Sequence, residues 1–425
     1  MSSSSSSDSD SSEKSEERDL SRLLVIEPLY GGGHKKMIDS LLKICRKVER
    51  KVYRSTLAGV AQRRPKWING VQLNYKYAIE VGPKKRYTLI TMPPTKWEWR
   101  SRCSAMYLAE IIPRDHSYEI LFCSSVLPLA ELIGIRPDLA HLFKIVYFHE
   151  NHLELTLYPY EDLNYHLGHS EIMTCLAADQ VLFNSNYHAE SFIAAISKHM
   201  AKQPDFTVSN LEKKIRNKSQ VVHFPLDLHT IELCTGSAKK RRKPTLCIIW
   251  PHRWELDRNP LMFFRIIKRM DDEGYDFRVI MLPSSYMVDP QYPLQLQLMD
   301  DIPKSRLLVL DDIESSDRAY YASLKCGDVI LSTAKHEFFA HQIMEGMYCN
   351  LIPVIPRLPV YQELFNDIKD VYDNENQLYE ILVDLCDKKR AGILDADPNY
   401  KRNTYRFESC RWFQSLMSVL KCKLI

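Results

Sequence analysis

The sequence predicts an α/β protein built from two doubly wound parallel-sheet domains joined by a linker. Three observations lead to this prediction. The chain has 425 residues, more than the roughly 250–300 at which a single hydrophobic core stops growing. Short continuous apolar runs alternate with amphipathic stretches, as expected for parallel strands with helices on both faces of the sheet. A polar segment interrupts this alternation once, after which it starts again.

The first domain is expected over residues 21–230, after a Ser- and acid-rich tail at 1–20 whose composition is typical of disorder. Its first strand is the apolar run at 23–26, which is followed by a glycine turn and by apolar residues at helical spacing over 37–48. Further strands are expected at 87–92, 120–124, 144–149, 180–184 and 220–224, and helices at 164–178 and 186–200.

The linker is expected at 231–244, where polarity rises and a run of five basic residues occurs. The second domain is expected over 245–400, with strands at 245–250, 277–282, 306–310, 328–332 and 351–355 and helices at 259–270, 317–326 and 339–349. A last helix within 401–425, at about 403–420, is expected to cross back onto the first domain.

One segment of the first domain does not follow the alternation. Residues 43–86 contain 13 Lys and Arg against two Glu, and more chain than a strand-helix-strand unit needs. A surface insertion, an artefact of gene prediction and a basic patch for phosphate backbone are the three interpretations.

Composition limits the compartment. Eleven cysteines without a Cys-x-x-Cys pair indicate a reducing environment. No run approaches the ~20 apolar residues of a membrane span, and the first residues lack the apolar part of a signal peptide. We therefore expect a cytoplasmic protein that does not enter a membrane, with the nucleus as a second compartment. The ending Cys422-Lys423-Leu424-Ile425 formally fits a prenylation motif, for which coincidence is the alternative.

The glycine turn after the first strand consists of Gly31, Gly32 and Gly33. A turn that opens a helix presents free backbone N–H groups to an anion, and glycines allow close approach of a phosphate. A purely steric role in the turn is the alternative. The pattern is not Gly-x-Gly-x-x-Gly, which argues against a nicotinamide dinucleotide.

A second candidate follows the strand at 245–250. Arg253 and Arg258 lie in a loop at the carboxyl edge of the sheet, where ligands of α/β proteins bind, and both can turn to a diphosphate. A solvated loop is the alternative.

The third candidate is the segment from Glu337 to Glu345. Glu337 follows a strand, Phe339 and Ala340 lie at a helix start, and Glu345 is about two turns into the helix. A carboxylate accepts hydrogen bonds from vicinal hydroxyls, and a helix start can face a diphosphate. The alternative is that Glu337 caps the helix while Glu345 lies in solvent.

Polar and aromatic residues follow two further strands. His149 ends a strand and can act as a general base or bond a sugar hydroxyl, with a structural role as the alternative. The side chains near 97–100 can stack a base, or simply pack. The candidates in these two segments are Trp97, Trp99, Arg100, Glu150 and Asn151, and a role in binding the acceptor substrate is implied for them only by the resemblance described next.

Together these segments resemble the retaining GT-B glycosyltransferases, and more narrowly the tRNA-queuosine mannosyltransferases. The pieces that carry the resemblance are Ile26-Glu27, Tyr30-Gly31-Gly32, His34-Lys35, Lys96-Trp97, Trp99-Arg100, Tyr147–Asn151, Phe183-Asn184-Ser185, Trp250–Glu255 and Ser332–Phe339. The wider resemblance to the GT-B enzymes also rests on the Glu337-x7-Glu345 pattern, and together the pieces span about residues 26–345.

The resemblance implies a GT-B architecture, in which two Rossmann-like domains face each other across a donor cleft. It also implies transfer of mannose from GDP-mannose to queuosine at the wobble position of tRNA-Asp, with retention of configuration and without a metal or other cofactor. Arg253 and Arg258 would hold the diphosphate, Glu345 the ribose and Glu337 the mannose hydroxyls. The Gly31–Gly33 loop would close over the donor, and His149 would lie beside the reacting sugar.

The sequence departs from the family pattern at the start of the helix. Ala340 replaces a glycine, His341-Gln342 replaces small residues, and Arg258 stands where many wider relatives have Lys. The alternatives are thus a GT-B transferase with another donor or acceptor, and a non-catalytic relative that binds tRNA or nucleotide.

Overall fold

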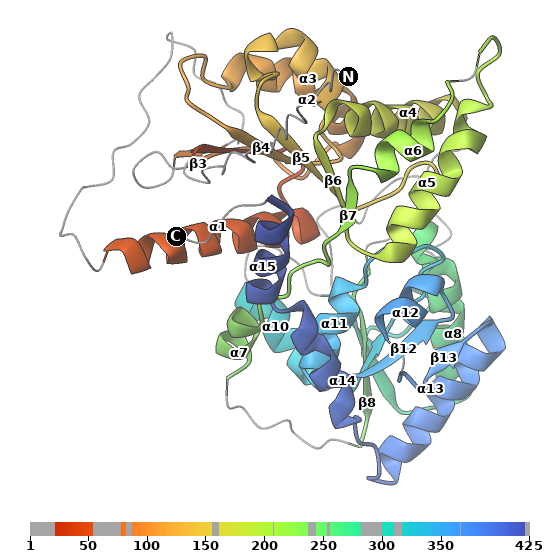
Figure 1. The fold of residues 1–425 in the computed structure, drawn as a ribbon. Helices are drawn as coiled ribbons and strands as arrows, with labels where there is room; N and C mark the ends of the chain where they lie inside the picture. The colour runs from red at the N-terminus through yellow and green to blue at the C-terminus, as the bar shows by residue number, and fades with distance from the viewer. Residues whose placement is uncertain are drawn as a thin grey trace, which may run out of the picture.

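The computed structural model describes residues 22–53, 78–81, 87–154, 161–206, 208–236, 244–252, 256–281, 300–309, 317–365 and 367–420. Two α/β domains lie one above the other in Figure 1, each with helices on both faces of a central sheet. The prediction of two doubly wound domains is confirmed. Within the described residues, no helix is long and apolar enough to cross a membrane.

The first sheet has seven strands in the order β2-β3-β1-β4-β5-β6-β7. All neighbours pair in parallel except β2 and β3, which are antiparallel. The strands are β1 (Leu23–Glu27), β2 (Ala78–Val81), β3 (Tyr87–Thr91), β4 (Ile120–Ser124), β5 (Phe143–Phe148), β6 (Gln180–Phe183) and β7 (Ser219–Val221). Strands β1, β3 and β4 are buried at every position, which explains the apolar runs Leu23–Ile26 of β1 and Ile120–Cys123 of β4.

The helices of the first domain lie on both faces of this sheet (Figure 1). They are α1 (Gly32–Tyr53), α2 (Trp97–Ile111), α3 (Leu129–Ile135), α4 (Glu161–Ala177), α5 (Asn186–Met200) and α6 (Leu211–Arg216), with a 3-10 turn at Pro137–Leu139. Ser185 caps α5 by accepting a hydrogen bond from the backbone N–H of His188.

The second sheet has six strands in the order β10-β9-β8-β11-β12-β13, all pairing in parallel. This is the strand order of a Rossmann fold, in which the order reverses between β8 and β11. The strands are β8 (Leu246–Trp250), β9 (Phe277–Met281), β10 (Leu307–Val309), β11 (Val329–Leu331), β12 (Ile352–Pro356) and β13 (Val371–Tyr372). The helices are α8 (Pro260–Asp272), α10 (Asp317–Cys326), α11 (His341–Tyr348), α12 (Pro359–Leu364) and α13 (Glu375–Arg390), with a 3-10 turn at Leu256–Arg258.

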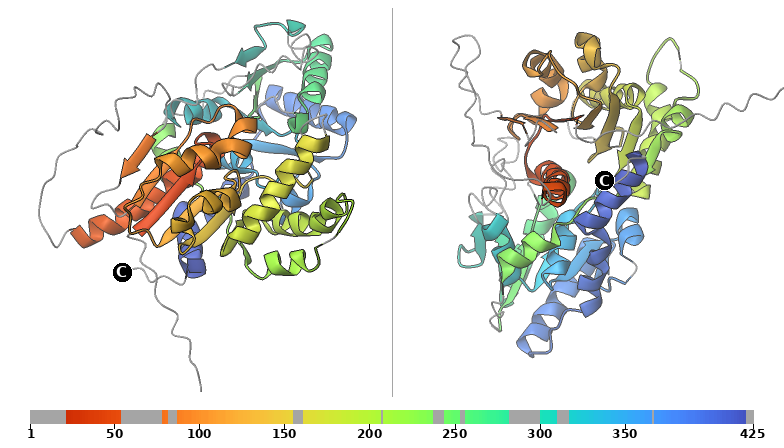
Figure 2. Two further views of the ribbon diagram at one scale, coloured as in Figure 1. Left: turned by 90° about the horizontal axis from the view of Figure 1, so that it is seen from above. Right: turned by 60° about the vertical axis from the view of Figure 1, so that its left-hand side comes forward.

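The chain passes between the domains twice. After β7, α7 (Leu228–Thr235) packs against α10 of the second domain. Later α14 (Pro398–Thr404) and the 3-10 turn Tyr405–Phe407 lead to α15 (Ser409–Leu420), which packs against α1 of the first domain (Figure 2, right). The two passages are bonded to each other, because Leu226 N–H donates to the Phe407 carbonyl (2.7 Å) and Ser409 N–H donates to the Leu226 carbonyl (2.9 Å).

The structure describes only parts of the segments that the sequence set apart as tail, basic segment, linker and C-terminal ending. The first part of segment 43–86 belongs to α1, which runs to Tyr53, and β2 forms near its end. The first part of the expected linker 231–244 is the second half of α7. The tail at 1–20, residues 54–77, residues 237–243 and the ending 421–425 lie outside the described residues.

Candidate active site

A cavity of about 210 Å³ lies between the two domains, at the carboxyl ends of their strands. Its lining from the first domain includes Gly31, Gly32, Gly33, His34 and Lys36, and from the second domain Pro251, Arg258, Tyr320, Tyr321, His341, Gln342 and Glu345. Strands of both sheets thus direct their loops into one cleft, as ligand sites of α/β folds require.

The glycine loop forms the first-domain wall of this cavity. Gly31 packs so closely on the connection between β3 and α2 that an added Cβ would lie 2.4 Å from the Cβ of Pro94. Gly32 has a φ of +49°, which a residue with a side chain rarely adopts. Gly33 faces the second domain, where an added Cβ would meet the His341 ring at 3.4 Å. The N-terminus of α1 therefore points into the cleft.

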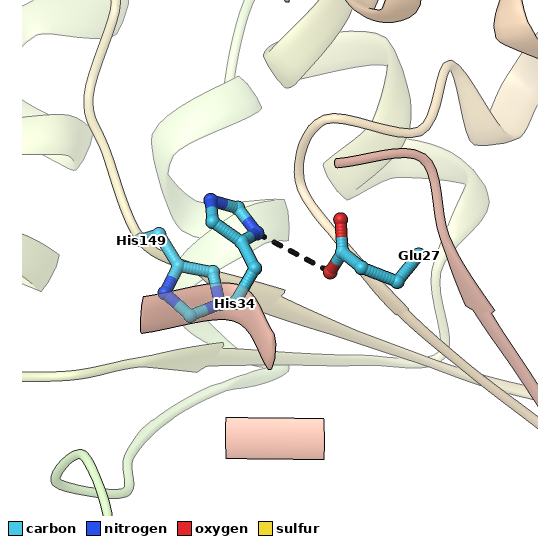
Figure 3. A group of neighbouring side chains, drawn as sticks. All are labelled: Glu27, His34 and His149. Atoms are coloured by element: carbon cyan, nitrogen blue, oxygen red, sulfur yellow. Dashed lines mark hydrogen bonds and ion pairs between the residues drawn. The ribbon is translucent and has the colours of Figure 1, made fainter. Parts of the chain in front are cut away.

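Behind the loop, Glu27 and His34 form a buried pair (Figure 3). Glu27 is the last residue of β1 and accepts hydrogen bonds from Leu29 N–H (2.9 Å) and from the hydroxyl of Ser124 (3.0 Å), which ends the neighbouring strand β4. His34 Nδ1 lies 3.2 Å from the same carboxylate. Its ring lies 3.9 Å from the ring of His149, at an interplanar angle of 32°.

Glu27, His34 and His149 offer ligand atoms within 4.8 Å of one another, close enough to consider a metal ion. Two features oppose that interpretation. Glu27 already accepts two protein hydrogen bonds besides His34. The rings of His34 and His149 are tilted by 32° with their centroids 3.9 Å apart, and His34 Nδ1 is already engaged with Glu27 Oε2 at 3.2 Å, well beyond the roughly 2 Å at which a nitrogen and an oxygen hold a zinc ion. The group fits an oriented pair of histidines better than a metal site.

His149 itself lies behind His34, beyond the residues that line the cavity. Burial, together with the neighbouring His34, holds its pKa well below the usual range, so the ring is neutral at physiological pH. Its Nε2 is buried without a hydrogen-bond partner among the described residues. A neutral ring with one unsatisfied nitrogen can bind a hydroxyl that reaches it.

Glu345 lies on α11 and is buried at the second-domain wall. Three side chains donate to it: Lys36 of the first domain (2.6 Å), Tyr320 (2.6 Å) and Tyr321 (3.0 Å). Burial raises the pKa of Glu345, but the charges of Lys36 and His341 and the hydrogen bonds from Lys36 and Tyr320 together outweigh that effect, and the net pKa is lowered. Glu345 is therefore ionised and joins the two domains through Lys36.

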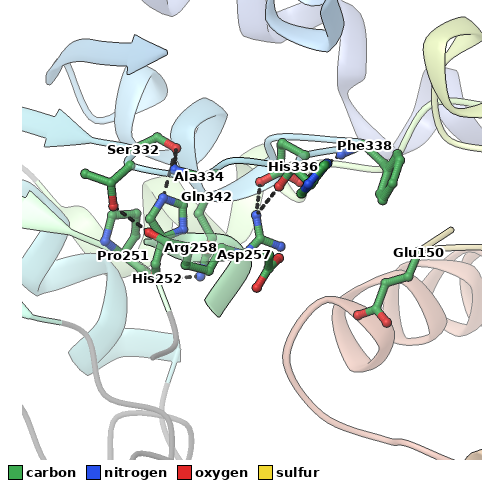
Figure 4. Close-up of polar contacts among 12 residues, drawn as sticks. Glu150, Pro251, His252, Asp257, Arg258, Ser332, Ala334, His336, Phe338 and Gln342 are labelled. Carbon is green, nitrogen blue, oxygen red and sulfur yellow. Dashed lines mark hydrogen bonds and ion pairs between the residues drawn. The ribbon is translucent and has the colours of Figure 1, made fainter. Parts of the chain in front are cut away.

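Glu337 lies in the loop after β11, beside Arg258. Figure 4 shows Arg258 together with its neighbours Asp257 and His336. Arg258 donates to Glu337 Oε2 (2.7 Å) and to the carbonyl of His336 (3.2 Å), and Asp257 lies 3.2 Å from its Nε. Backbone N–H groups of Phe338 and Phe339 donate to Glu337 Oε1. Burial raises the pKa of Glu337, although Arg258 opposes this. Arg258 thus orients Glu337 while it lines the cavity.

The two domains also touch outside the cavity, at the loop that carries Glu337. Ser185 donates to the Phe338 carbonyl (2.8 Å), and the Phe338 ring stacks on His188 at 4.6 Å. Glu363 of α12 accepts from the backbone N–H groups of Asn186 (2.8 Å) and Tyr187 (2.7 Å) at the start of α5. This contact fixes the position of the Glu337 loop against the first domain.

The residues at which the sequence was expected to depart from the pattern it resembles lie at this wall. His341 stacks on Phe224 of the first domain, with ring centroids 5.1 Å apart, and Gln342 donates to the Pro251 carbonyl (2.8 Å). Both side chains line the cavity. Ala340 and Phe339 are buried, and neither lines the cavity.

The expected acceptor residues lie apart from the cavity, in the first domain. Trp97 begins α2, with its ring 5.0 Å from that of His152, while Trp99 is 59% exposed. Arg100 follows on the same helix. Glu150 lies 3.3 Å from His152 and away from the Arg258 group in Figure 4. Asn151 is fully buried, where it donates to Ser191.

The structure therefore gathers Gly31–Gly33, Arg258 and Glu345 around one cavity and places Glu337 against Arg258. Arg253 lies outside the described residues. Sequence reasoning missed Lys36, Tyr320 and Tyr321, whose only signal was a position in helices expected near the site. It quoted Glu27 and His34 as part of a motif and gave them no role.

Comparison with known proteins identifies the same family that the sequence motifs resemble. A family model described as "tRNA-queuosine alpha-mannosyltransferase N-terminal" matches residues 72–226. The tRNA-queuosine alpha-mannosyltransferase of Drosophila melanogaster is 33% identical over 374 residues, which cover 87% of this chain and 88% of that protein.

Among solved structures, the trehalose-6-phosphate synthase OtsA is similar with a TM-score of 0.61 and 12% identity, covering 94% of this chain and 99% of that one. An alpha,alpha-trehalose-phosphate synthase (UDP-forming) from Burkholderia vietnamiensis is similar with a TM-score of 0.60 and 11% identity, covering 94% and 99%. At this identity the likeness concerns the fold, and it confirms the expected GT-B architecture.

Proposed function

This chain belongs to the tRNA-queuosine alpha-mannosyltransferase family, and from that premise we propose that it transfers mannose from GDP-mannose to queuosine at the wobble position of tRNA-Asp. The observation that carries the proposal is the cavity between the domains. It combines a glycine loop at a helix N-terminus, an arginine and a buried ionised glutamate. These are the groups that a nucleoside diphosphate needs: N–H donors and a cation for the phosphates, and an acceptor for the ribose hydroxyls.

For the donor, we propose that Glu345 binds the ribose and that the diphosphate lies between the Gly31–Gly33 loop and Arg258. Arg253, on the loop after β8, is the second proposed phosphate ligand. Phe339 and Ala340, which directly precede α11, would support this wall. Charge that develops on the departing phosphate is then stabilised by fixed donors, without a metal ion in the proposed reaction.

For the sugar, we propose that Glu337 accepts hydrogen bonds from mannose hydroxyls. Arg258 and two backbone N–H groups fix the carboxylate and occupy three of its roughly four acceptor positions, which leaves one position for a mannose hydroxyl. His149 would offer its unsatisfied Nε2 to a hydroxyl beside the reacting carbon. The attacking hydroxyl of queuosine would approach from the face that the phosphate leaves. Its oxygen would bond to the anomeric carbon as the bond from that carbon to the phosphate oxygen breaks, and its proton would pass to the departing phosphate, so that configuration is retained.

For the acceptor, we propose the first-domain surface near the start of α2. The exposed Trp99 lies beside the guanidinium of Arg102, 5.4 Å from its ring, and offers a face on which a base can stack. Trp97, Arg100 and Glu150 lie near it in the chain or the fold, whereas Asn151 would act by holding the loop after β5.

The test is direct transfer. Purified protein is incubated with GDP-mannose and queuosine-containing tRNA-Asp, and digested nucleosides are analysed by mass spectrometry. We expect one added hexose on queuosine, lost in Glu337→Ala and kept in the surface control Glu380→Gln, since Glu380 is exposed on α13. No hexose on queuosine under varied conditions would refute the proposal.

Two alternatives have their own readouts. Another donor would show in a thermal-shift panel of GDP-, UDP- and ADP-sugars, because a bound donor stabilises the folded state. A non-catalytic nucleotide-binding role is favoured by one observation, that His341 and Gln342 occupy the cavity wall where the family has small residues. It predicts nucleotide binding without any transfer, and the same binding in Glu337→Ala.

A further inference from the structure

The carboxylate of Glu345 is nearly saturated in the absence of a donor. Its Oε1 accepts from Lys36 and Tyr321, and its Oε2 accepts from Tyr320. A carboxylate has about four acceptor positions, so one position is left. A ribose that binds through both vicinal hydroxyls needs two. Donor binding through Glu345 therefore requires that one of the three present partners leaves.

Lys36 is the partner that can leave. Tyr320 and Tyr321 are consecutive on α10 of the same domain, and Tyr321 is buried. Lys36 reaches across the cleft from α1, and its side chain is 26% exposed. Its ammonium lies 4.3 Å from the ring of Tyr320 and 5.4 Å from that of Tyr321, held by one carboxylate and two aromatic faces.

When a donor is bound, the released ammonium of Lys36 can pair with the donor diphosphate instead of Glu345. Lys36 is the third residue after Gly33, and both line the cavity that also contains Arg258. Arg258 already forms ion pairs with Asp257 and Glu337, so these two carboxylates largely neutralise its positive charge. A diphosphate carries two or more negative charges, and a flexible lysine side chain is well suited to follow such a group.

We propose that Lys36 exchanges anions during donor binding: it pairs with Glu345 in the empty enzyme and passes to the donor diphosphate when the ribose occupies Glu345. This inference rests on the proposed function, since it needs a nucleoside diphosphate in the cavity. It adds a positioning residue that reports donor occupancy to both domains. The link between the domains changes from protein–protein to protein–donor–protein.

The exchange predicts opposite effects of one substitution on two ligands. Guanosine offers the ribose without phosphate, so it must displace Lys36 and gains nothing in return. GDP displaces Lys36 and then binds it. Lys36→Met should therefore leave guanosine binding unchanged or tighten it severalfold, and weaken GDP binding roughly 10- to 100-fold, the range for a lost charge-assisted hydrogen bond.

Isothermal titration of guanosine and GDP into wild type, Lys36→Met and Lys36→Arg measures this. Lys36→Arg keeps the charge and should keep most of the GDP affinity. The matched control is Lys389→Met, which removes a similarly buried lysine–aspartate pair (Lys389–Asp328, 2.9 Å) remote from the cavity, and should leave both affinities unchanged.

Equal losses for guanosine and GDP in Lys36→Met would overturn the exchange, because Lys36 would then only maintain Glu345. Unchanged affinity for both ligands would overturn it as well. In either case, GDP binding to wild type would still support GDP-mannose as the donor. Wild type that does not bind GDP overturns the exchange and the proposed donor together.

Discussion

Replacing Gly31 by alanine tests whether the glycine loop positions the donor. The new Cβ would lie 2.4 Å from the Cβ and 2.5 Å from the Cγ of Pro94. Carbon atoms in contact need about 3.5 Å, so the loop or Pro94 must move by about 1 Å. Overpacking of this kind costs about 1–3 kcal/mol of stability. A displacement of 1 Å in a substrate-positioning group can lower the rate about 100-fold, or about 2.7 kcal/mol of transition-state stabilisation.

The assay is the hexose-transfer rate at subsaturating GDP-mannose, together with the thermal midpoint. Gly31→Ala should lose about 100-fold in kcat/KM. The control is Gly33→Ala, in which the closest contact is the His341 ring at 3.4 Å, a distance that a small ring shift relieves. The double variant Gly31→Ala/Pro94→Gly removes both clashing atoms and should recover most of the activity.

Wild-type activity in Gly31→Ala would refute this reasoning, because the loop would then not position the donor. Equal losses in Gly31→Ala and Gly33→Ala would refute the steric explanation. Failure of Pro94→Gly to restore any activity would point to a need for glycine flexibility instead.

Three further predictions follow from other contacts. Glu345→Gln should lower the free energy of unfolding by roughly 1–3 kcal/mol, and the thermal midpoint with it, because it removes the charged acceptor of a buried ion pair. An unchanged thermal midpoint would contradict this prediction. Gly346→Ala should destabilise the second domain by about 1–3 kcal/mol, measured by urea unfolding, because the new Cβ would lie 2.5 Å from Ile330 Cδ1. The pKa of His152 is raised to about 10: burial lowers it, but Glu171 and Glu150 outweigh burial. The folded-state pKa of His152 thus exceeds the ordinary value of about 6.5. The protonated His152 therefore stabilises the folded state fully below pH ~6.5, and this contribution to the free energy of unfolding is lost as the pH rises towards 10. The midpoint difference between wild type and Glu171→Gln should shrink over that range, and a constant difference would contradict it.

The strands were predictable because both faces of each sheet are covered. β1 and β4 are buried at every position and therefore read as continuous apolar runs. Helix α2 was not predicted, because its first residues Trp97–Arg100 give no apolar stripe. The helix expected from 339 begins at His341, because Glu337 accepts the N–H groups of Phe338 and Phe339 and holds them in a turn.

The site was predictable only where a residue belongs to a loop or helix that directly follows a strand. The glycine loop and Glu345 were found from the strand-loop-helix pattern, and both line the cavity. The partner of Glu345 was not predictable, because Lys35 and Lys36 are adjacent in sequence. Both line the cavity, and which of them reaches Glu345 depends on the rotation of α1, and thus on where that helix begins. The pairing of Glu27 with Ser124 likewise depends on which strands become neighbours.

The doubled passage between the domains has a consequence for biosynthesis. Helix α15 packs on α1 of the first domain, but it follows the second domain in the sequence. It is therefore translated only after the whole second domain. During synthesis the face of α1 that α15 covers stays open while roughly half of the chain is still being made. The first domain therefore completes its packing last, although its strands emerge first. Shortening the chain before Ser409 should leave a ribosome-released product with an uncovered apolar face, prone to capture by chaperones.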